Sequence, residues 1–420
     1  MADRVAYIYS QDYARVADQL PANRHRSSLV HALVETFGLW QHPRVDVLPP
    51  PMATPAELAR FHDPKYVAKL LQPPPSEHDL VGKDLVGTSH PTNEHNDTDH
   101  RDVLDSDSEG ESDDPDAGPV SAGNRTLRVM ERYGLVDDCP VFPDLPAYSQ
   151  LVAGGSLVAA LCLLRGSHRY AIHWDGGRHH ARRAQASGFC YVNDIVLAIL
   201  ALRRKFDRVL YVDMDVHHGD GVEAAFQFSE KVYTLSFHRY DRGFYPGTGS
   251  CEFVGKGRGK HFALNVPLRQ GLCDQTFAAL FDRVLSQAVQ AFRPNCIVLQ
   301  CGCDGLAQDP TKEWNLTPSG LGAAVTAAMS HDLPVLFLGG GGYNHPNAAR
   351  CNAYLTSLIV APGMLAHDTD IPEHQFYAQY SPTFNLQVPA GAMPDSNSAN
   401  YVEELMAMAT QRIGCLDAIA

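Results

Sequence analysis

The feature that most constrains the fold is an alternation of short apolar runs with longer stretches of helical period. Short runs rich in β-branched and aromatic residues are typical of strands buried on both faces, and they occur at 5–9, 170–173, 209–212, 232–237, 296–300 and 335–338. Stretches of helical period accompany them at 27–37, 151–164, 193–204, 274–292 and 319–329. The alternation predicts an α/β fold with a mostly parallel central sheet flanked by helices.

Residues 72–123 interrupt this pattern with a segment rich in Pro, Ser, Asn, His and Asp. Such a composition buries too little apolar surface to offset the entropy lost on ordering the chain. One doubly wound core can extend over most of the 420 residues, so we expect a single domain. We place this domain at 1–380, interrupted by a mobile acidic insertion at 73–123 that could bind partners. A C-terminal extension follows at 381–420, with a terminal helix at 401–411.

The net charge of −14 is concentrated in that insertion. Residues 94–116 contain eleven Asp or Glu against one basic residue, Arg101, and so carry −10, which leaves −4 for the rest of the chain. A nearly neutral body without a basic stripe is not typical of proteins that bind phosphate backbones. We therefore expect no direct, sequence-specific DNA binding.

The distribution of apolar and cysteine residues favours an intracellular protein that does not enter a membrane. Residues 1–13 include Asp3, Arg4 and Asp12, which is unlike the apolar region of a signal peptide. The longest uninterrupted apolar runs, such as 334–338, are far shorter than a membrane span. The ten cysteines show no disulfide-framework spacing, so we expect reduced thiols.

Polar clusters follow four of the predicted strands. In a doubly wound sheet, ligands bind beyond the carboxyl ends of the strands, where the connecting loops converge. Here those loops carry the residues 175–180, 213–217, 304 and 339–343. We therefore predict one site built from four strand ends.

Asp213, Asp215 and His217 alternate at one strand end, and a period of two directs their side chains to one face. On its own the pattern is also compatible with a solvated strand end. An apolar run precedes it, however, and a carboxylate near the interior is costly unless a metal or a charged partner compensates it. Asp304 follows another apolar run and adds a third ligand. Asp215, His217 and Asp304 form a three-ligand set with an open position, the pattern of catalytic zinc, which can lower the pKa of bound water to about 7.

His179 and His180 follow a Gly-Gly turn, and Asp213 and Asp220 remain as partners for them. A carboxylate behind an imidazole fixes its tautomer and raises its basicity. We predict that His180 acts as general base and acid, with His179 as its electrostatic partner.

The glycines at 339–342 lack the Lys-Ser/Thr of a P-loop and the spacing of a dinucleotide fingerprint. They instead allow the backbone to approach a ligand closely, and we assign Gly341 and Gly342 to substrate binding. Tyr343 then presents a phenol that can stabilise a tetrahedral oxyanion. Losing one such donor typically costs ~10²–10³ in rate.

Four motifs occur in the order found in one enzyme family. They read ASGFCYVND at 186–194, YVDMDVHHGDG at 211–221, GFYPGTG at 243–249 and LGGGGYN at 338–344. In these motifs the chain resembles class I zinc-dependent histone deacetylases, and within them the histone deacetylase 8 branch. The resemblance extends from residue 5 to about residue 380, the acidic insertion excepted.

This resemblance implies the arginase-deacetylase fold, a single domain with an eight-stranded parallel sheet. It also implies hydrolysis of N6-acetyl-lysine in histone tails or other proteins to lysine and acetate, with one catalytic zinc ion. A role in chromatin and transcription regulation follows, and a location in the nucleus and/or the cytoplasm. The family's zinc ligands and catalytic residues coincide with those assigned above, which are Asp215, His217, Asp304, His179, His180, Asp213, Asp220 and Tyr343.

Further roles rest on the resemblance alone. It implies an acyl-lysine tunnel formed by Gly188, Phe189 and Tyr245, a rim carboxylate at Asp138 and a pocket-floor guanidinium at Arg26. Two structural potassium sites are implied, one at Asp213, Asp215, His217, Ser236 and Phe237, and one at Phe226, Ser229, Val232 and Phe262.

Four positions depart from the family pattern and put specificity in question. Arg178 replaces an aromatic residue, Tyr245 a phenylalanine, Cys303 an alanine and Thr311 an apolar rim residue. Two alternative functions remain open on the sequence, an acetylpolyamine amidohydrolase-like enzyme and a weakly active deacetylase-like scaffold in a repressor complex. An arginase would need further carboxylates for a second metal, and no such cluster follows Asp304.

Overall fold

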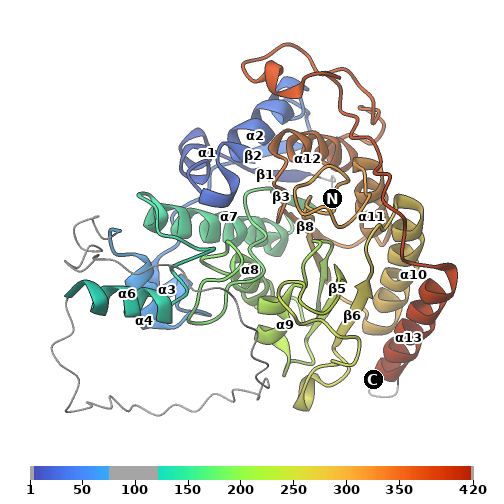
Figure 1. The fold of residues 1–420 in the computed structure, drawn as a ribbon, viewed down its shortest axis with the longest axis horizontal. Coiled ribbons are helices and arrows are strands. Elements are labelled where there is room, and N and C mark those ends of the chain that lie inside the picture. The colour runs from blue at the N-terminus through green and yellow to red at the C-terminus, as the bar shows by residue number, and fades with distance from the viewer. Residues whose placement is uncertain (1–3, 75–121, 418–420) are drawn as a thin grey trace, which may run out of the picture.

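A computed structural model of the protein describes residues 4–74 and 122–417, which are built around one sheet of eight parallel strands (Figure 1). The strand order is β2-β1-β3-β8-β7-β4-β5-β6. The strands are β1 Val5–Ile8, β2 Val45–Leu48, β3 Tyr170–His173, β4 Val209–Asp213, β5 Val232–Arg239, β6 Ala263–Leu268, β7 Cys296–Gln300 and β8 Val335–Leu338. The predicted α/β class and the eight-stranded parallel sheet are confirmed.

The sequence patterns identified every strand except the two at the edges of the sheet, β2 and β6. Strand β2 is only partly buried and contains Asp46, while β6 contains Asn265 and Pro267. Polar residues and proline are tolerated at sheet edges, where one side of the strand makes no ladder hydrogen bonds. Both segments therefore lack the continuous β-branched signal of the inner strands.

Helices cover both faces of the sheet. Because side chains alternate along a strand, Val5 and Tyr7 enter one apolar core, whereas Ala6 and Ile8 enter the other. The first core is completed by α2 Arg26–Thr36, α10 Asp274–Phe292, α11 Pro318–Ser330, α12 His345–Val360 and α13 Ala399–Asp417. The second is completed by α1 Gln11–Ala17, α3 Pro55–Leu58, α4 Pro64–Leu70, α6 Ala122–Arg132, α7 Leu145–Arg165, α8 Asp194–Leu202 and α9 Asp220–Phe226.

Helix α7 corrects the expectation that the apolar segments of the chain are far too short to span a membrane. Its 21 residues are long and apolar enough to cross a membrane by length and composition, although Gly, Ser and Gln interrupt the apolar run. The most apolar window of the helix is 67% buried inside the fold. Packing against α8 and the sheet accounts for this composition, because a helix that is apolar all round is typical of a protein core.

The C-terminal helix α13 lies alongside α10 (Figure 1) and buries Leu405, Ala409 and Ile413 in the first core. It includes the helix predicted at 401–411. Nearly all of the predicted insertion at 73–123 lies outside the described residues. The division into a domain at 1–380 and an extension at 381–420 remains a prediction.

The topology explains why four distant segments meet. Strands β3, β8, β7 and β4 are consecutive neighbours in the sheet, although they are distant in the sequence. The loops after their carboxyl ends carry the histidine pair, the glycine-rich loop with Tyr343, Asp304, and the pair Asp215 and His217. The predicted site therefore occupies the centre of one end of the sheet, where such folds bind ligands.

Candidate active site

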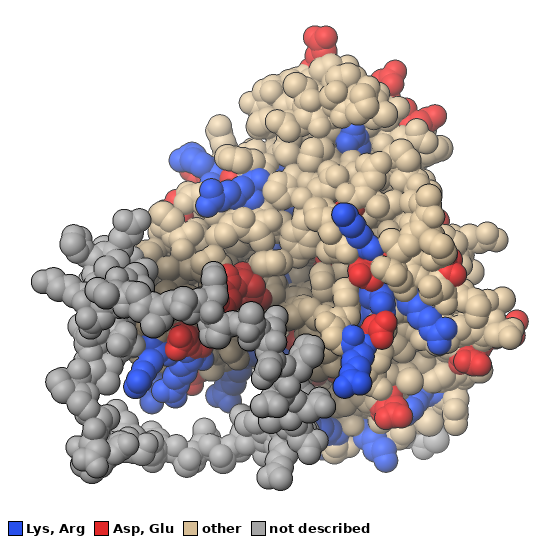
Figure 2. Space-filling view, viewed as in Figure 1, with Lys and Arg blue, Asp and Glu red and all other residues tan. Residues whose placement is uncertain are grey.

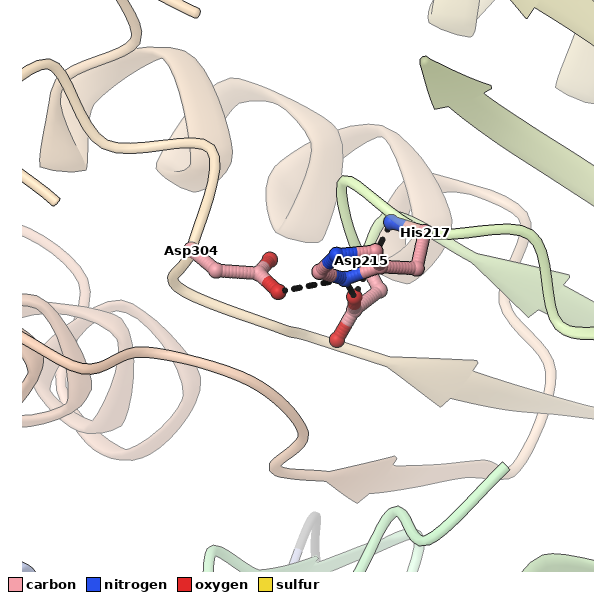
Figure 3. A group of neighbouring side chains, drawn as sticks. All are labelled: Asp215, His217 and Asp304. Atoms are coloured by element: carbon pink, nitrogen blue, oxygen red, sulfur yellow. Dashed lines mark hydrogen bonds and ion pairs between the residues drawn. The ribbon is translucent and has the colours of Figure 1, made fainter. Parts of the chain in front are cut away.

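Asp215, His217 and Asp304 converge from two loops (Figure 3). His217 Nδ1 lies 3.1 Å from Asp215 Oδ1 and 3.0 Å from Asp304 Oδ2, and the ligand atoms of all three residues lie within 4.8 Å of one another. Both carboxylates are almost fully buried, with 1% and 0% exposure. Two carboxylates and one imidazole nitrogen form a donor set that suits a divalent cation such as zinc.

The electrostatics of this triad also fit a cation. Burial, followed by the charge of Asp215, raises the pKa of Asp304 to about 7. Burial opposes a charge on His217, but the hydrogen bonds to Asp215 and Asp304 outweigh it and raise its pKa to about 10. The pocket thus concentrates negative charge that a positive ion would compensate.

The glycine-rich loop and a buried amide complete the surroundings of Asp215. Its Oδ2 accepts hydrogen bonds from the Gly341 N–H and from Gln300 Nε2, both at 2.8 Å. A Cβ at position 341 would lie 2.1 Å from Asp304 Oδ2, so only glycine permits this approach. Gln300 was not predicted as a site residue, although a polar residue ending the apolar strand β7 could have indicated it.

Each histidine of the pair has its own carboxylate. His179 Nδ1 lies 2.8 Å from Asp213 Oδ2, and His180 Nδ1 lies 2.7 Å from Asp220 Oδ1. Because a carboxylate only accepts, each Nδ1 carries the proton and donates it, which leaves Nε2 as the second ring nitrogen. His179 Nε2 lies 3.8 Å from Asp215 Oδ1, so the ring of His179 faces the triad.

The two imidazoles differ in their affinity for a second proton. Burial opposes a charge on His179, but the charges of Asp213 and Asp215 outweigh it and raise its pKa to about 9. Burial, and then the neighbouring charge of His179, lower the pKa of His180 to about 4. At neutral pH the positive charge therefore lies on His179, whose ring centroid is 3.9 Å from that of the neutral His180.

Two residues at the start of α8 hold the loop of the histidine pair, and the sequence patterns did not assign them to the site. Asn193 Nδ2 donates to the carbonyl oxygens of His179 at 3.3 Å and Ala181 at 3.0 Å. The Asp194 carboxylate accepts from the N–H groups of Gly177 and Arg178. Both are fully buried, and two polar residues that open an otherwise apolar helix were the available signal.

The predicted tunnel residues lie together beside His180. The rings of Tyr245 and His180 meet edge to face with centroids 4.9 Å apart, and Phe189 meets Tyr343 at 5.6 Å. Gly188 lies between these walls with φ +53°, and a Cβ there would lie 2.4 Å from His180 Cδ2. A small residue with left-handed backbone freedom is therefore required at this position.

Two hydrogen bonds link the residues that were predicted to form the tunnel and its rim. The Gly188 N–H donates to Asp138 Oδ2 at 2.7 Å, which places Asp138 beside the predicted tunnel residues. The Tyr245 hydroxyl lies 2.7 Å from Ser187 Oγ, so the phenol that replaces the usual phenylalanine joins the two walls.

The remaining departures from the family pattern are buried or turned inward. The Thr311 hydroxyl donates to the Asp304 carbonyl oxygen at 2.7 Å. The buried Arg178 guanidinium donates to the Asp175 carbonyl oxygen, 2.8 Å from Nη2. Cys303 packs in the first core. The predicted floor residue Arg26 donates from Nη1 to the carbonyl oxygens of Gly340 and Gly342.

The residues assigned to potassium also fall into two groups in space. Asp213 and Ser236 are register partners in β4 and β5, with Phe237 next in β5. In the second group, the Ser229 N–H donates to the Phe226 carbonyl at the end of α9, close to Val232 at the start of β5. Phe262, which precedes β6, accepts from Thr234 N–H in the same strand pair.

Known proteins align with almost the whole chain. The histone deacetylase domain family matches residues 20–359. Histone deacetylase 8 of Xenopus tropicalis is 40% identical over 401 residues, which cover 95% of each chain. Histone deacetylase 8 of Danio rerio is 37% identical, over 96% of this chain and 93% of that protein. Histone deacetylase 9 of Arabidopsis thaliana is 36% identical, over 96% and 83% respectively.

Proposed function

The chain belongs to the class I histone deacetylases, in the histone deacetylase 8 branch, and we propose that Asp215, His217 and Asp304 hold its catalytic zinc ion. The enzyme is a lysine deacetylase: it hydrolyses the amide of N6-acetyl-lysine in histones or other proteins and releases lysine and acetate. Acetylated proteins such as histones are its substrates, and it is a regulator of chromatin and transcription. The family and activity implied by the sequence motifs are confirmed.

The observation that carries the zinc assignment is the convergence of two buried carboxylates and one imidazole beside two carboxylate-paired histidines. A bound zinc ion supplies Lewis acidity, which polarises the acetyl carbonyl and makes water more acidic. Asp215, His217 and Asp304 would hold the ion with three ligands, the number used by catalytic rather than structural zinc sites, which would keep a position open for substrate or water.

Substrate positioning falls to the tunnel. The rings of Phe189 and Tyr245 flank the lysine stem, while Gly188 keeps the passage between them narrow. Asp138 at the rim accepts N–H groups of the peptide backbone next to the modified lysine. Arg26 closes the floor, and the backbone of Gly341 and Gly342 lines the acetyl end. Holding the amide in this way converts a bimolecular reaction into one within the complex.

The histidine pair moves the protons. His180 Nε2 accepts a proton from the attacking water as the water oxygen bonds to the acetyl carbon. Asp220 holds the Nδ1–H and stabilises the resulting positive charge, and His179 with Asp213 supports the same orientation. His180 then gives its proton to the lysine nitrogen as the C–N bond breaks.

Tyr343 stabilises the charge that develops on the acetyl oxygen. Its phenol donates a hydrogen bond to the tetrahedral oxyanion, which is stronger than the bond to the ground-state carbonyl. Burial raises the pKa of this phenol, so it keeps its proton and remains a donor.

Several further assignments belong to the same proposal. The two groups of residues described at β4–β5 and near α9 bind structural potassium ions. The enzyme works in the nucleus and/or the cytoplasm, without sequence-specific DNA contacts or membrane insertion. On the face shown in Figure 2, Lys and Arg side chains stand among Asp and Glu side chains. The acidic insertion binds partner proteins.

The test is release of lysine from an acetyl-lysine peptide before chelation, after chelation and after zinc restoration, with Asp215→Ala as control. Activity that disappears with the metal and returns with zinc supports the proposal. Zinc-loaded protein that is inactive on acetyl peptides but active on acetylated polyamines would contradict the protein substrate. Equal activity of Asp215→Ala would contradict the ligand assignment.

A further inference from the structure

Asp309 is a buried carboxylate, 2% exposed, in the loop that follows the ligand Asp304. Its Oδ2 accepts the backbone N–H of Tyr343 at 2.7 Å and that of Asn344 at 3.1 Å. Its Oδ1 accepts the N–H of Thr311 at 3.0 Å. These three donors are backbone N–H groups, and within residues 4–74 and 122–417 Asp309 forms no salt bridge.

The glycine loop before Tyr343 is held from another direction, because Arg26 Nη1 donates to the carbonyl oxygens of Gly340 and Gly342. Gly342 before Tyr343 has φ +123°, which only glycine adopts readily, and α12 begins at His345 after it. Asn344 is the N-cap of α12, so the Asp309 charge also lies near the positive end of the helix dipole. The Tyr343 N–H itself, between that loop and the helix, is held by Asp309.

The same carboxylate is tied to the triad through Thr311. The Thr311 hydroxyl donates to the Asp304 carbonyl oxygen at 2.7 Å, and its N–H donates to Asp309. The loop after β7, which carries Asp304, and the loop after β8, which carries Tyr343, thus share one buried anchor.

We propose that Asp309 is a positioning residue that fixes the distance between the Tyr343 phenol and the metal triad. The inference rests on the proposed function, because it assigns Tyr343 to the oxyanion. Tyr343 touches the substrate and Asp309 does not, so Asp309 acts only through the backbone of Tyr343. A misplacement of about 1 Å in such a donor can cost about 10²-fold in rate.

The experiment compares full-length Asp309→Ala, Asp309→Asn, Tyr343→Phe and the double variant of Asp309→Ala with Tyr343→Phe. Asp274→Ala is the matched control, because Asp274 also accepts a backbone N–H, that of Thr317 at 2.8 Å, at the start of α10. For each protein, kcat, KM, zinc content and urea midpoint are measured with one acetyl-lysine peptide.

We expect Asp309→Ala to lose ~10–100-fold in kcat, with KM within ~3-fold and zinc content unchanged. Asp309→Asn keeps one oxygen for the Tyr343 N–H and should lose only ~3–10-fold. In the Tyr343→Phe background the Asp309→Ala change should cost less than ~3-fold more, because the two residues act as one unit. Asp274→Ala should lower the urea midpoint but leave kcat unchanged.

Losses that multiply in the double variant, or an equal kcat loss in Asp274→Ala, would overturn the inference. A loss that only follows zinc content would overturn it as well. If Asp309→Ala does not fold, Asp309→Asn alone and with Tyr343→Phe provide the same comparison. A wild-type enzyme without metal-dependent turnover would instead overturn the proposed function, so the two failures are distinguishable.

Discussion

His62 makes a specific prediction about stability in acid, because its two ring nitrogens have opposite hydrogen-bonding roles. Nε2 accepts the backbone N–H of Asn193 at 2.9 Å, and Nδ1 lies 3.2 Å from the carbonyl oxygen of Arg183, to which it donates. A second proton would place an Nε2–H against the Asn193 N–H. Burial lowers the pKa of His62 from 6.5 to about 4.

The direction in which stability changes with pH follows from proton uptake by His62. Between pH 6.5 and about 4 the unfolded chain binds a proton at His62 and the folded protein does not. The contribution of neutral His62 to the free energy of unfolding is therefore fully present above pH 6.5. It is lost as the pH falls through this window. Since a tenfold difference in proton affinity is about 1.4 kcal/mol, the full loss is about 3 kcal/mol, of which about 2 kcal/mol is reached by pH 5.

The matched variant is His62→Gln, whose amide can accept from Asn193 and donate to Arg183 but does not titrate. Urea unfolding at several pH values between about 7 and 5 gives the free energy for both proteins. The wild type should lose about 2 kcal/mol more than the variant across this range. Parallel pH profiles would refute the reasoning, since all other titrating groups are common to both proteins.

Three further predictions concern catalysis. Tyr343→Phe should fold and bind zinc but lose ~10²–10³ in kcat, and near-normal turnover would remove its oxyanion role. Tyr245→Phe should raise KM for an acetyl peptide ~2–10-fold with kcat within ~2-fold, because one neutral hydrogen bond at a 39% exposed side chain is lost. Ser187→Ala should have the same effect, and additive losses in the double variant would argue against a shared bond. Deleting residues 76–118, which lie outside the described part of the chain, should leave activity on a short peptide intact; failure to fold would show that they are structural.

The inner strands could be predicted because they are buried on both faces. A strand such as β7, Cys296–Gln300, has no solvent-facing side and therefore appears as a continuous apolar run. The edge strands β2 and β6 could not be found in this way, because polar residues and proline are tolerated where hydrogen bonding is one-sided.

The residue types of the site were also visible in the sequence. Asp215 and His217 follow a buried strand at a spacing of two, and the chemistry of carboxylate and imidazole donors indicates a metal whatever the rest of the fold. Which carboxylate supports which histidine was not decided by the sequence, and the structure pairs Asp213 with His179 and Asp220 with His180.

The sequence by itself determined the fold class and the donor groups, because burial periodicity and ligand chemistry are local properties of a chain, and its four motifs carried the resemblance to the enzyme family. The tertiary structure alone decided that β3, β8, β7 and β4 are neighbours, and hence that four distant loops meet. It also decided that Gln300 and Asp309 support Asp215 and Tyr343. Such contacts join residues separated by tens of positions, and they depend on strand order and close packing, which no local pattern encodes.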